Sequence, residues 1–109
     1  MTTRVAGAVR GRADAEAIFK AEGCSSPRAW GNPPGDRYGA HSHDYHKVLF
    51  CLEGSITFHL TDGGADADAN SDANADMELS AGGRLDLPPG TEHSATVGPD
   101  GVGCIEASR

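Results

Sequence analysis

The sequence has few cysteines and no long apolar run. Its three cysteines, at positions 24, 51 and 104, are odd in number and widely spaced, and they include no CxxC pair. This pattern argues against a disulfide framework and against a zinc knuckle, so we expect reduced thiols. The first residues carry positive charge but lack the apolar stretch of a secretion signal, and no later stretch approaches the length of a membrane span. We therefore expect a cytoplasmic protein that does not enter a membrane.

A cluster of basic residues is also missing. The chain of 109 residues has a formal net charge of -7, with 9 lysines and arginines against 16 aspartates and glutamates. Six of the acidic residues and no basic residue fall between Thr61 and Glu78, so most of the net charge belongs to one segment. Because nucleic-acid binders and anionic-membrane binders present clustered positive charge, we expect neither kind of partner.

Length and composition predict one compact domain. Apolar residues make up 38% of the chain, which is too many for a disordered chain, and the 15 glycines and 6 prolines favour tight turns. Residues 13–22 are good helix formers, and Gly23 can end this helix in the left-handed conformation. Residues 24–39 are rich in proline and glycine, which predicts an irregular lead-in. We accordingly divide the chain into an N-terminal arm, residues 1–34, and a β domain, residues 35–109.

The rest of the sequence favours short strands. The β-rich runs HKVLFCLEG and SITFHL meet at Glu53-Gly54-Ser55, which predicts a hairpin. Further short strands are predicted for MELS, GGRLDL, HSATVG and GVGCIEA. This spacing is typical of an antiparallel sandwich or barrel, so we expect an all-β fold. The run VLFCL is apolar on both faces, and we expect the helix or a second subunit to cover its outer face.

The acidic segment, residues 62–76, superficially resembles a calcium-binding loop. Asp66, Asp68 and Asn70 stand at alternate positions, but the glycine and the bidentate glutamate of an EF-hand loop are both absent. We interpret the segment as a flexible, solvated loop between strands rather than as a weak calcium site.

The stretch HSHDYHK, residues 41–47, is the densest group of metal-binding side chains in the sequence. Residues two apart in a strand point the same way, so His41 and His43 present both imidazoles to one face. Two neighbouring histidines alone bind a metal weakly, and a third donor must come from elsewhere in the fold. His93, which follows a tight turn in PPGTEHS, is the best candidate for that donor.

Two longer patterns surround these histidines and resemble the two motifs of the cupin family. The first motif, G(x)5HxH(x)3-4E(x)6G, is matched by residues 35–54, with Lys47 at the glutamate position. The second motif, G(x)5PxG(x)2H(x)3N, is matched by residues 82–97, with Val97 in place of the asparagine. All spacings match, and the two motifs with the segment between them cover somewhat over half of the chain.

The resemblance implies a small single-domain cupin of the RmlC-like superfamily. Its fold would be a double-stranded β-helix, or jelly-roll barrel, with one short N-terminal helix. It implies a divalent transition metal, Fe, Mn, Ni, Zn or Cu, held inside the barrel by His41, His43 and His93. The motif glutamate would add a fourth ligand, and here that ligand is missing. Three neutral histidines with open coordination positions remain a workable site, as in some cupin dioxygenases.

Lys47 is difficult to reconcile with a metal. An ammonium about 5 Å from a divalent ion is repelled by roughly 7 kcal/mol at an effective dielectric constant of about 20. This repulsion is large beside the ~10 to 16 kcal/mol available at a good structural zinc site. A metal can therefore be held only if Lys47 is turned aside by a carboxylate, loses its proton on burial, or shares the cavity with an anion.

Several other residues are candidates for the barrel interior. Arg37 has the same parity as the first two histidines and would meet an anion beside Lys47, unless it lies on the surface. Cys51 shares the parity of Lys47, so we expect it inside the barrel as a buried thiol, either inert or reactive. His46 has the opposite parity and would replace the missing ligand only if the strand bulges. We expect His59 to be solvated.

Two classes of function remain open. One is a binding module, expected as a homodimer, whose cationic pocket of three histidines holds a metal and a small anionic ligand such as a carboxylate or phosphate. The other is a metal-dependent enzyme of the dioxygenase, isomerase or lyase type, acting on a small anionic or carbonyl substrate. Lys47 is then the catalytic candidate, because it would orient the substrate or act as an acid or base. The resemblance does not separate the two classes, since cupins host many chemistries.

Overall fold

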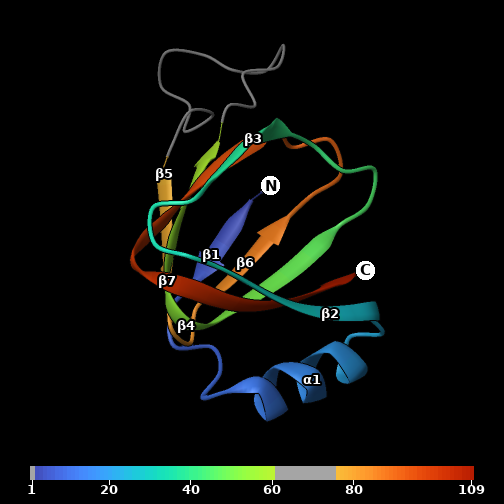
Figure 1. Cartoon of the computed structure of the whole chain (residues 1–109). Coiled ribbons are helices and arrows are strands. Elements are labelled where there is room, and N and C mark those ends of the chain that lie inside the picture. The colour runs from blue at the N-terminus through green and yellow to red at the C-terminus, as the bar shows by residue number, and fades with distance from the viewer. Residues whose placement is uncertain (1, 61–75) are drawn as a thin grey trace.

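The computed structural model of the chain describes residues 2–60 and 76–109. The expected acidic loop, apart from Asp76, lies outside these residues. Figure 1 shows the described elements in chain order, which are β1 (Thr3–Val5), α1 (Arg12–Ala21), β2 (Ser25–Asn32), β3 (Arg37–His41), β4 (Lys47–Leu60), β5 (Asp76–Ser80), β6 (Arg84–Leu87) and β7 (His93–Ser108). The single helix of this described part is neither long enough nor apolar enough to cross a membrane.

The strands form an antiparallel barrel around two long strands, β4 and β7. These two strands pair along nearly their whole length, from Lys47 opposite Ser108 to Leu60 opposite His93. At one end of this pair, β6 pairs with β4 and β1 pairs with β6, while β2 pairs with β7. The other end is extended by β5 beside β4 and by β3 beside β7. The prediction of an all-β fold with one short helix is therefore confirmed.

The hairpin predicted at Glu53-Gly54-Ser55 is wrong, because β4 continues through these residues as one bent strand. Its pairing with β7 shifts register on either side of Gly54. Gly54 has φ 69°, the partner strand contains Gly101 with φ 78°, and a Cβ at position 54 would collide with the carbonyl of Gly101. The two glycines let both strands bend together. For the same reason the two strands predicted within residues 93–108 are a single strand.

The irregular lead-in predicted for residues 24–39 is also wrong, because most of this segment forms two edge strands. Strand β2 pairs with the C-terminal half of β7, where Trp30 lies opposite Cys104. Strand β3 pairs with the N-terminal half of β7, where Arg37 lies opposite Thr96. An edge strand uses only one of its two edges, so it tolerates a proline such as Pro27, beside which the register of β2 shifts.

Helix α1 covers the outer face of the barrel, as Figure 1 shows. Within β4, Leu49 and Cys51 face the interior, whereas Val48 and Phe50 belong to a second apolar cluster on the outside. Phe19 of the helix joins this outer cluster, and its ring lies 5.3 Å from the ring of Phe50. The expected cover for the two-sided apolar strand is therefore the helix.

We expect the substitution Phe19→Ala to destabilise the fold by about 3 to 5 kcal/mol, because it empties a fully buried site between helix and sheet. The free energy of unfolding in urea measures this loss. Lys20→Ala, at an exposed position on the same helix, is the matched control and should change the free energy by less than about 0.5 kcal/mol. Equal losses for the two variants would show that the helix does not hold the barrel.

Candidate metal centre

Three histidines from two distant segments of the chain meet at one end of the barrel. His41 ends β3, His43 follows in the loop, and His93 begins β7 directly opposite His41. The ring centroids lie 4.4 Å apart for His41 and His93, 5.0 Å for His41 and His43, and 5.4 Å for His43 and His93. One ring nitrogen from each histidine lies within 4.8 Å of the other two. The structure thus brings together the three histidines that the sequence singled out.

The hydrogen bonds of these rings leave nitrogen lone pairs free for a metal. The Nδ1 atom of His41 lies 2.7 Å from the carbonyl oxygen of Gly39, and that of His93 lies 3.0 Å from the carbonyl oxygen of Thr91. A carbonyl only accepts, so each Nδ1 carries a proton, and in the neutral ring the lone pair is then on Nε2. The Nε2 atom of His43 is buried and has no hydrogen-bond partner among the described residues. This donor set fits a divalent transition metal, for which imidazole is a common ligand.

The surroundings favour the neutral form of two of these histidines. Burial lowers the pKa of His43, and the positive charge of Lys47 lowers it further. Burial also lowers the pKa of His93, against a raising effect of its hydrogen bond to Thr91. Because a metal competes with the proton for the same lone pair, a lowered pKa prepares an imidazole for coordination near neutral pH.

Lys47 is held by a carboxylate that sequence reasoning missed. Its Nζ atom lies 3.3 Å from Oε2 of Glu106, and both side chains are about 10% exposed. Trp30 Nε1 donates a hydrogen bond of 2.7 Å to the other carboxylate oxygen, and an Arg28 nitrogen lies 3.9 Å from Oε2. The sequence left three ways in which a metal could be held beside Lys47. The structure shows the first of them, an ion pair between Lys47 and a carboxylate. An acidic residue within the apolar run CIEA was the signal in the sequence.

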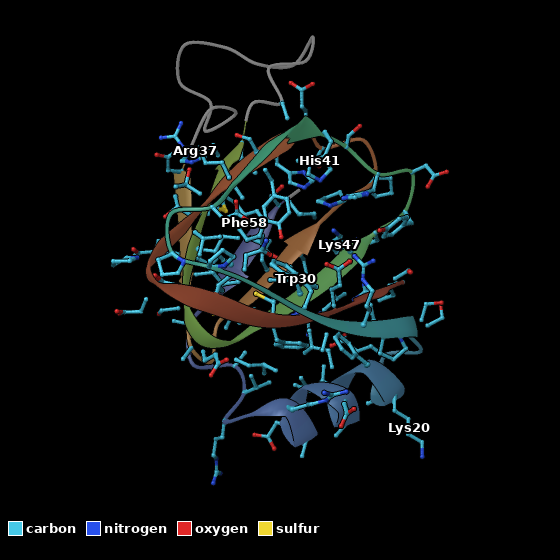
Figure 2. All side chains as sticks on the ribbon, in the orientation of Figure 1. Lys20, Trp30, Arg37, His41, Lys47 and Phe58 are labelled. Carbon is cyan, nitrogen blue, oxygen red and sulfur yellow. The ribbon has the colours of Figure 1, made fainter. Side chains whose placement is uncertain are left out.

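The histidines and Lys47 line a cavity of about 450 Å³ inside the barrel. In Figure 2, the side chains of Trp30, Lys47 and Phe58 lie within the barrel, and that of His41, which is exposed, lies near the top of the barrel. The apolar part of the wall comes from Ala29, Trp30, Tyr38, Leu49, Phe58 and Ala95. The cavity therefore combines a histidine-lined end, a charged wall and an apolar wall, which suits a small ligand.

Two other candidates do not reach this cavity. Arg37 is exposed and points away from the barrel in Figure 2. The register of β3 shifts between Tyr38 and His41, which breaks the parity that would have placed Arg37 inside. Tyr38 lines the cavity instead, and its hydroxyl donates a hydrogen bond to Asn32. Cys51 is buried as expected, but it packs in the apolar interior and does not line the cavity.

The remaining histidines are engaged elsewhere. The Nε2 atom of His46 lies 2.9 Å from Oδ2 of Asp86, so His46 does not replace the missing motif ligand. His59 was expected to be solvated, but its side chain is only 33% exposed. Its two ring nitrogens lie 2.8 Å from Asp76 Oδ1 and 2.9 Å from Thr96 Oγ1.

The resemblance of this chain to known proteins lies in its fold. No protein-family model and no curated protein sequence matches the chain. Solved structures do match. An RmlC-like cupin from Shewanella frigidimarina is 21% identical, with a TM-score of 0.59 over 75% of this chain and 62% of that one.

Two enzymes share the fold at lower identity. The DMSP lyase DddQ from Ruegeria pomeroyi is 18% identical, with a TM-score of 0.61 over 76% of this chain and 36% of that one. The ribosomal oxygenase YcfD from Escherichia coli, in complex with cobalt and succinic acid, is 16% identical, with a TM-score of 0.65 over 99% of this chain and 31% of that one. The chain spans less than two thirds of each of these proteins. These likenesses show that the chain has the cupin fold, a double-stranded β-helix.

Proposed function

We propose that this chain is a metal-binding protein of the cupin fold, in which His41, His43 and His93 hold one divalent transition metal. The supporting observation is the convergence of the three imidazoles, with the buried Nε2 atom of His43 left without a partner among the described residues. A buried polar atom without a hydrogen bond is costly, and a metal would remove that cost. When bound, a metal with three protein ligands supplies Lewis acidity and open positions for a ligand.

The second part of the proposal is a small anionic ligand in the cavity next to the metal. Lys47 presents its ammonium to the cavity, and Glu106 is its one recorded partner among the described residues. An ammonium has three N–H donors, so donors remain for the oxygens of a carboxylate or phosphate. The cavity of about 450 Å³ limits the ligand to a compact molecule. The apolar wall favours a ligand with some hydrocarbon beside its charged group.

A second candidate function is a metal-dependent enzyme of the dioxygenase, isomerase or lyase type. It is favoured by the position of the buried Lys47 and Glu106 in the same cavity as the histidines, where the pair can hold a proton for a reacting ligand. Metal-dependent turnover of a small anionic or carbonyl substrate, lost in His93→Ala, would establish this function in place of the binding module.

The homodimer and the cytoplasmic location stay predictions. Strand β2 pairs with β7 along one edge, and its other edge is paired with no strand of the described residues. An unpaired strand edge is a common place for a second copy to add, which supports the homodimer. Light scattering in solution measures the oligomeric state.

The protein purified without a histidine tag should contain up to one equivalent of Fe, Mn, Ni, Zn or Cu per chain. The double variant His41→Ala/His43→Ala should lose it, because the remaining histidine cannot hold the ion alone. Elemental analysis measures both. His59→Ala is the matched control, since this histidine lies outside the group of ligand atoms. A folded wild-type chain that cannot be loaded with any of these metals would contradict the proposal.

Small carboxylates or phosphate should stabilise the metal-loaded protein by mass action, by about 2.7 kcal/mol at a ligand concentration of 100 times Kd. Thermal unfolding with succinate or phosphate measures the effect. Lys47→Ala should abolish it, whereas Lys20→Ala on the exposed face of the helix should not. An unchanged stabilisation of Lys47→Ala by the same anions would show that Lys47 does not bind the ligand.

A further inference from the structure

A charged pair occupies the place where the cupin motif has a single carboxylate. The motif expects glutamate at position 47, and this chain has lysine there. Its carboxylate comes instead from Glu106 on the neighbouring strand, where Glu106 lies opposite Leu49 and Ser108 lies opposite Lys47. The Lys47 and Glu106 side chains approach to 3.3 Å in the same cavity as the three histidines.

Glu106 is held in place by groups other than Lys47. Trp30 donates its indole N–H to Oε1 over 2.7 Å, and the Trp30 ring packs edge-on against Tyr38 at 5.8 Å. Arg28, which is 73% exposed, approaches Oε2 at 3.9 Å from the rim. Because the Trp30 indole holds the Glu106 carboxylate, the carboxylate keeps its position when the Lys47 ammonium moves. Its negative charge therefore stays at a fixed place in the cavity.

The charges of both side chains reach the imidazoles. Lys47 and Glu106 line the same cavity as the three histidines. A metal ion bound by the imidazole rings would therefore lie in the opposing fields of the two charges. Among the described residues, the group of possible ligand atoms consists of histidine nitrogens and contains no carboxylate oxygen. Glu106 would therefore act on the ion through its electric field.

We propose that Glu106 is the counter-charge that makes the three-histidine centre compatible with Lys47. This inference rests on the proposed metal site. Glu106 offsets the repulsion between the Lys47 ammonium and a divalent ion, and it does so without coordinating the ion. Lys47 thereby stays in the cavity as a donor for an anionic ligand. Glu106 is not a metal ligand, because its charge acts on the ion across space and opposes that of Lys47.

A double-mutant cycle on metal affinity tests the pair. Calorimetric titration of Co²⁺ into metal-free protein compares the wild type, Glu106→Gln, Lys47→Met and the double variant. Removing the carboxylate should weaken binding by on the order of 10- to 100-fold, and removing the ammonium should tighten it by a similar factor. The double variant should return to within a few-fold of the wild type. If the substitutions only disturbed the structure, both single variants would bind Co²⁺ more weakly than the wild type. The double variant would then not recover the wild-type affinity.

The control for the carboxylate is Glu16→Gln, which removes one exposed negative charge from helix α1 and should leave the affinity unchanged. If folded Glu106→Gln binds Co²⁺ as the wild type does, the counter-charge proposal is wrong. If its Co²⁺ absorption spectrum changes shape while that of Lys47→Met does not, Glu106 is a ligand, which also overturns the proposal.

Two outcomes keep the proposal separate from the metal site on which it rests. If neither the wild-type chain nor Lys47→Met binds Co²⁺, the metal site itself is refuted. If only Lys47→Met binds the ion, the metal site stands and Glu106 is an inadequate counter-charge. If Glu106→Gln does not fold, the Co²⁺ affinities of Lys47→Met and of the double variant test the proposal instead. The double variant must bind more weakly than Lys47→Met, and equal affinities would overturn the proposal.

Discussion

The antiparallel ladder between β4 and β7 is the interaction on which the rest of the structure depends. Each of these strands runs through both layers of the barrel, and every other described strand pairs with one of them or with a strand that does. A strand that passes from one layer to the other must bend, and Gly54 and Gly101 supply left-handed backbone at the bend on both partners. The bend closes the barrel and creates the interior in which the cavity lies.

The same ladder places the chemistry. Strand β7 begins with His93, which the pairing with β3 sets opposite His41. Near its other end the same strand carries Glu106, which the pairing with β4 sets beside Lys47. One strand thus brings an imidazole of the histidine cluster and a charged carboxylate to the same cavity. The Lys47 and Glu106 charges offset each other there, beside the three histidines.

Much of the fold was predictable from local patterns. The spacing of histidine, glycine and proline indicated the two cupin motifs, and the apolar character of both faces of residues 48–52 indicated an outer cover. The turn signals at position 54 were misread because glycine favours both reversals and bulges, and the choice depends on the partner strand. Residues 24–39 were misread because an edge strand needs no alternating apolar pattern of its own.

The sequence by itself determined which side chains can bind a metal, since residue type and spacing place His41 and His43 on one face and offer His93 as the third donor. It also determined that Lys47 needed a partner. Only the tertiary structure decided that this partner is Glu106, and that Arg37 lies outside the cavity. The reason is that both outcomes depend on register between strands far apart in the chain. A shift in register, as within β3, changes the face on which a side chain lies and leaves no trace in local composition.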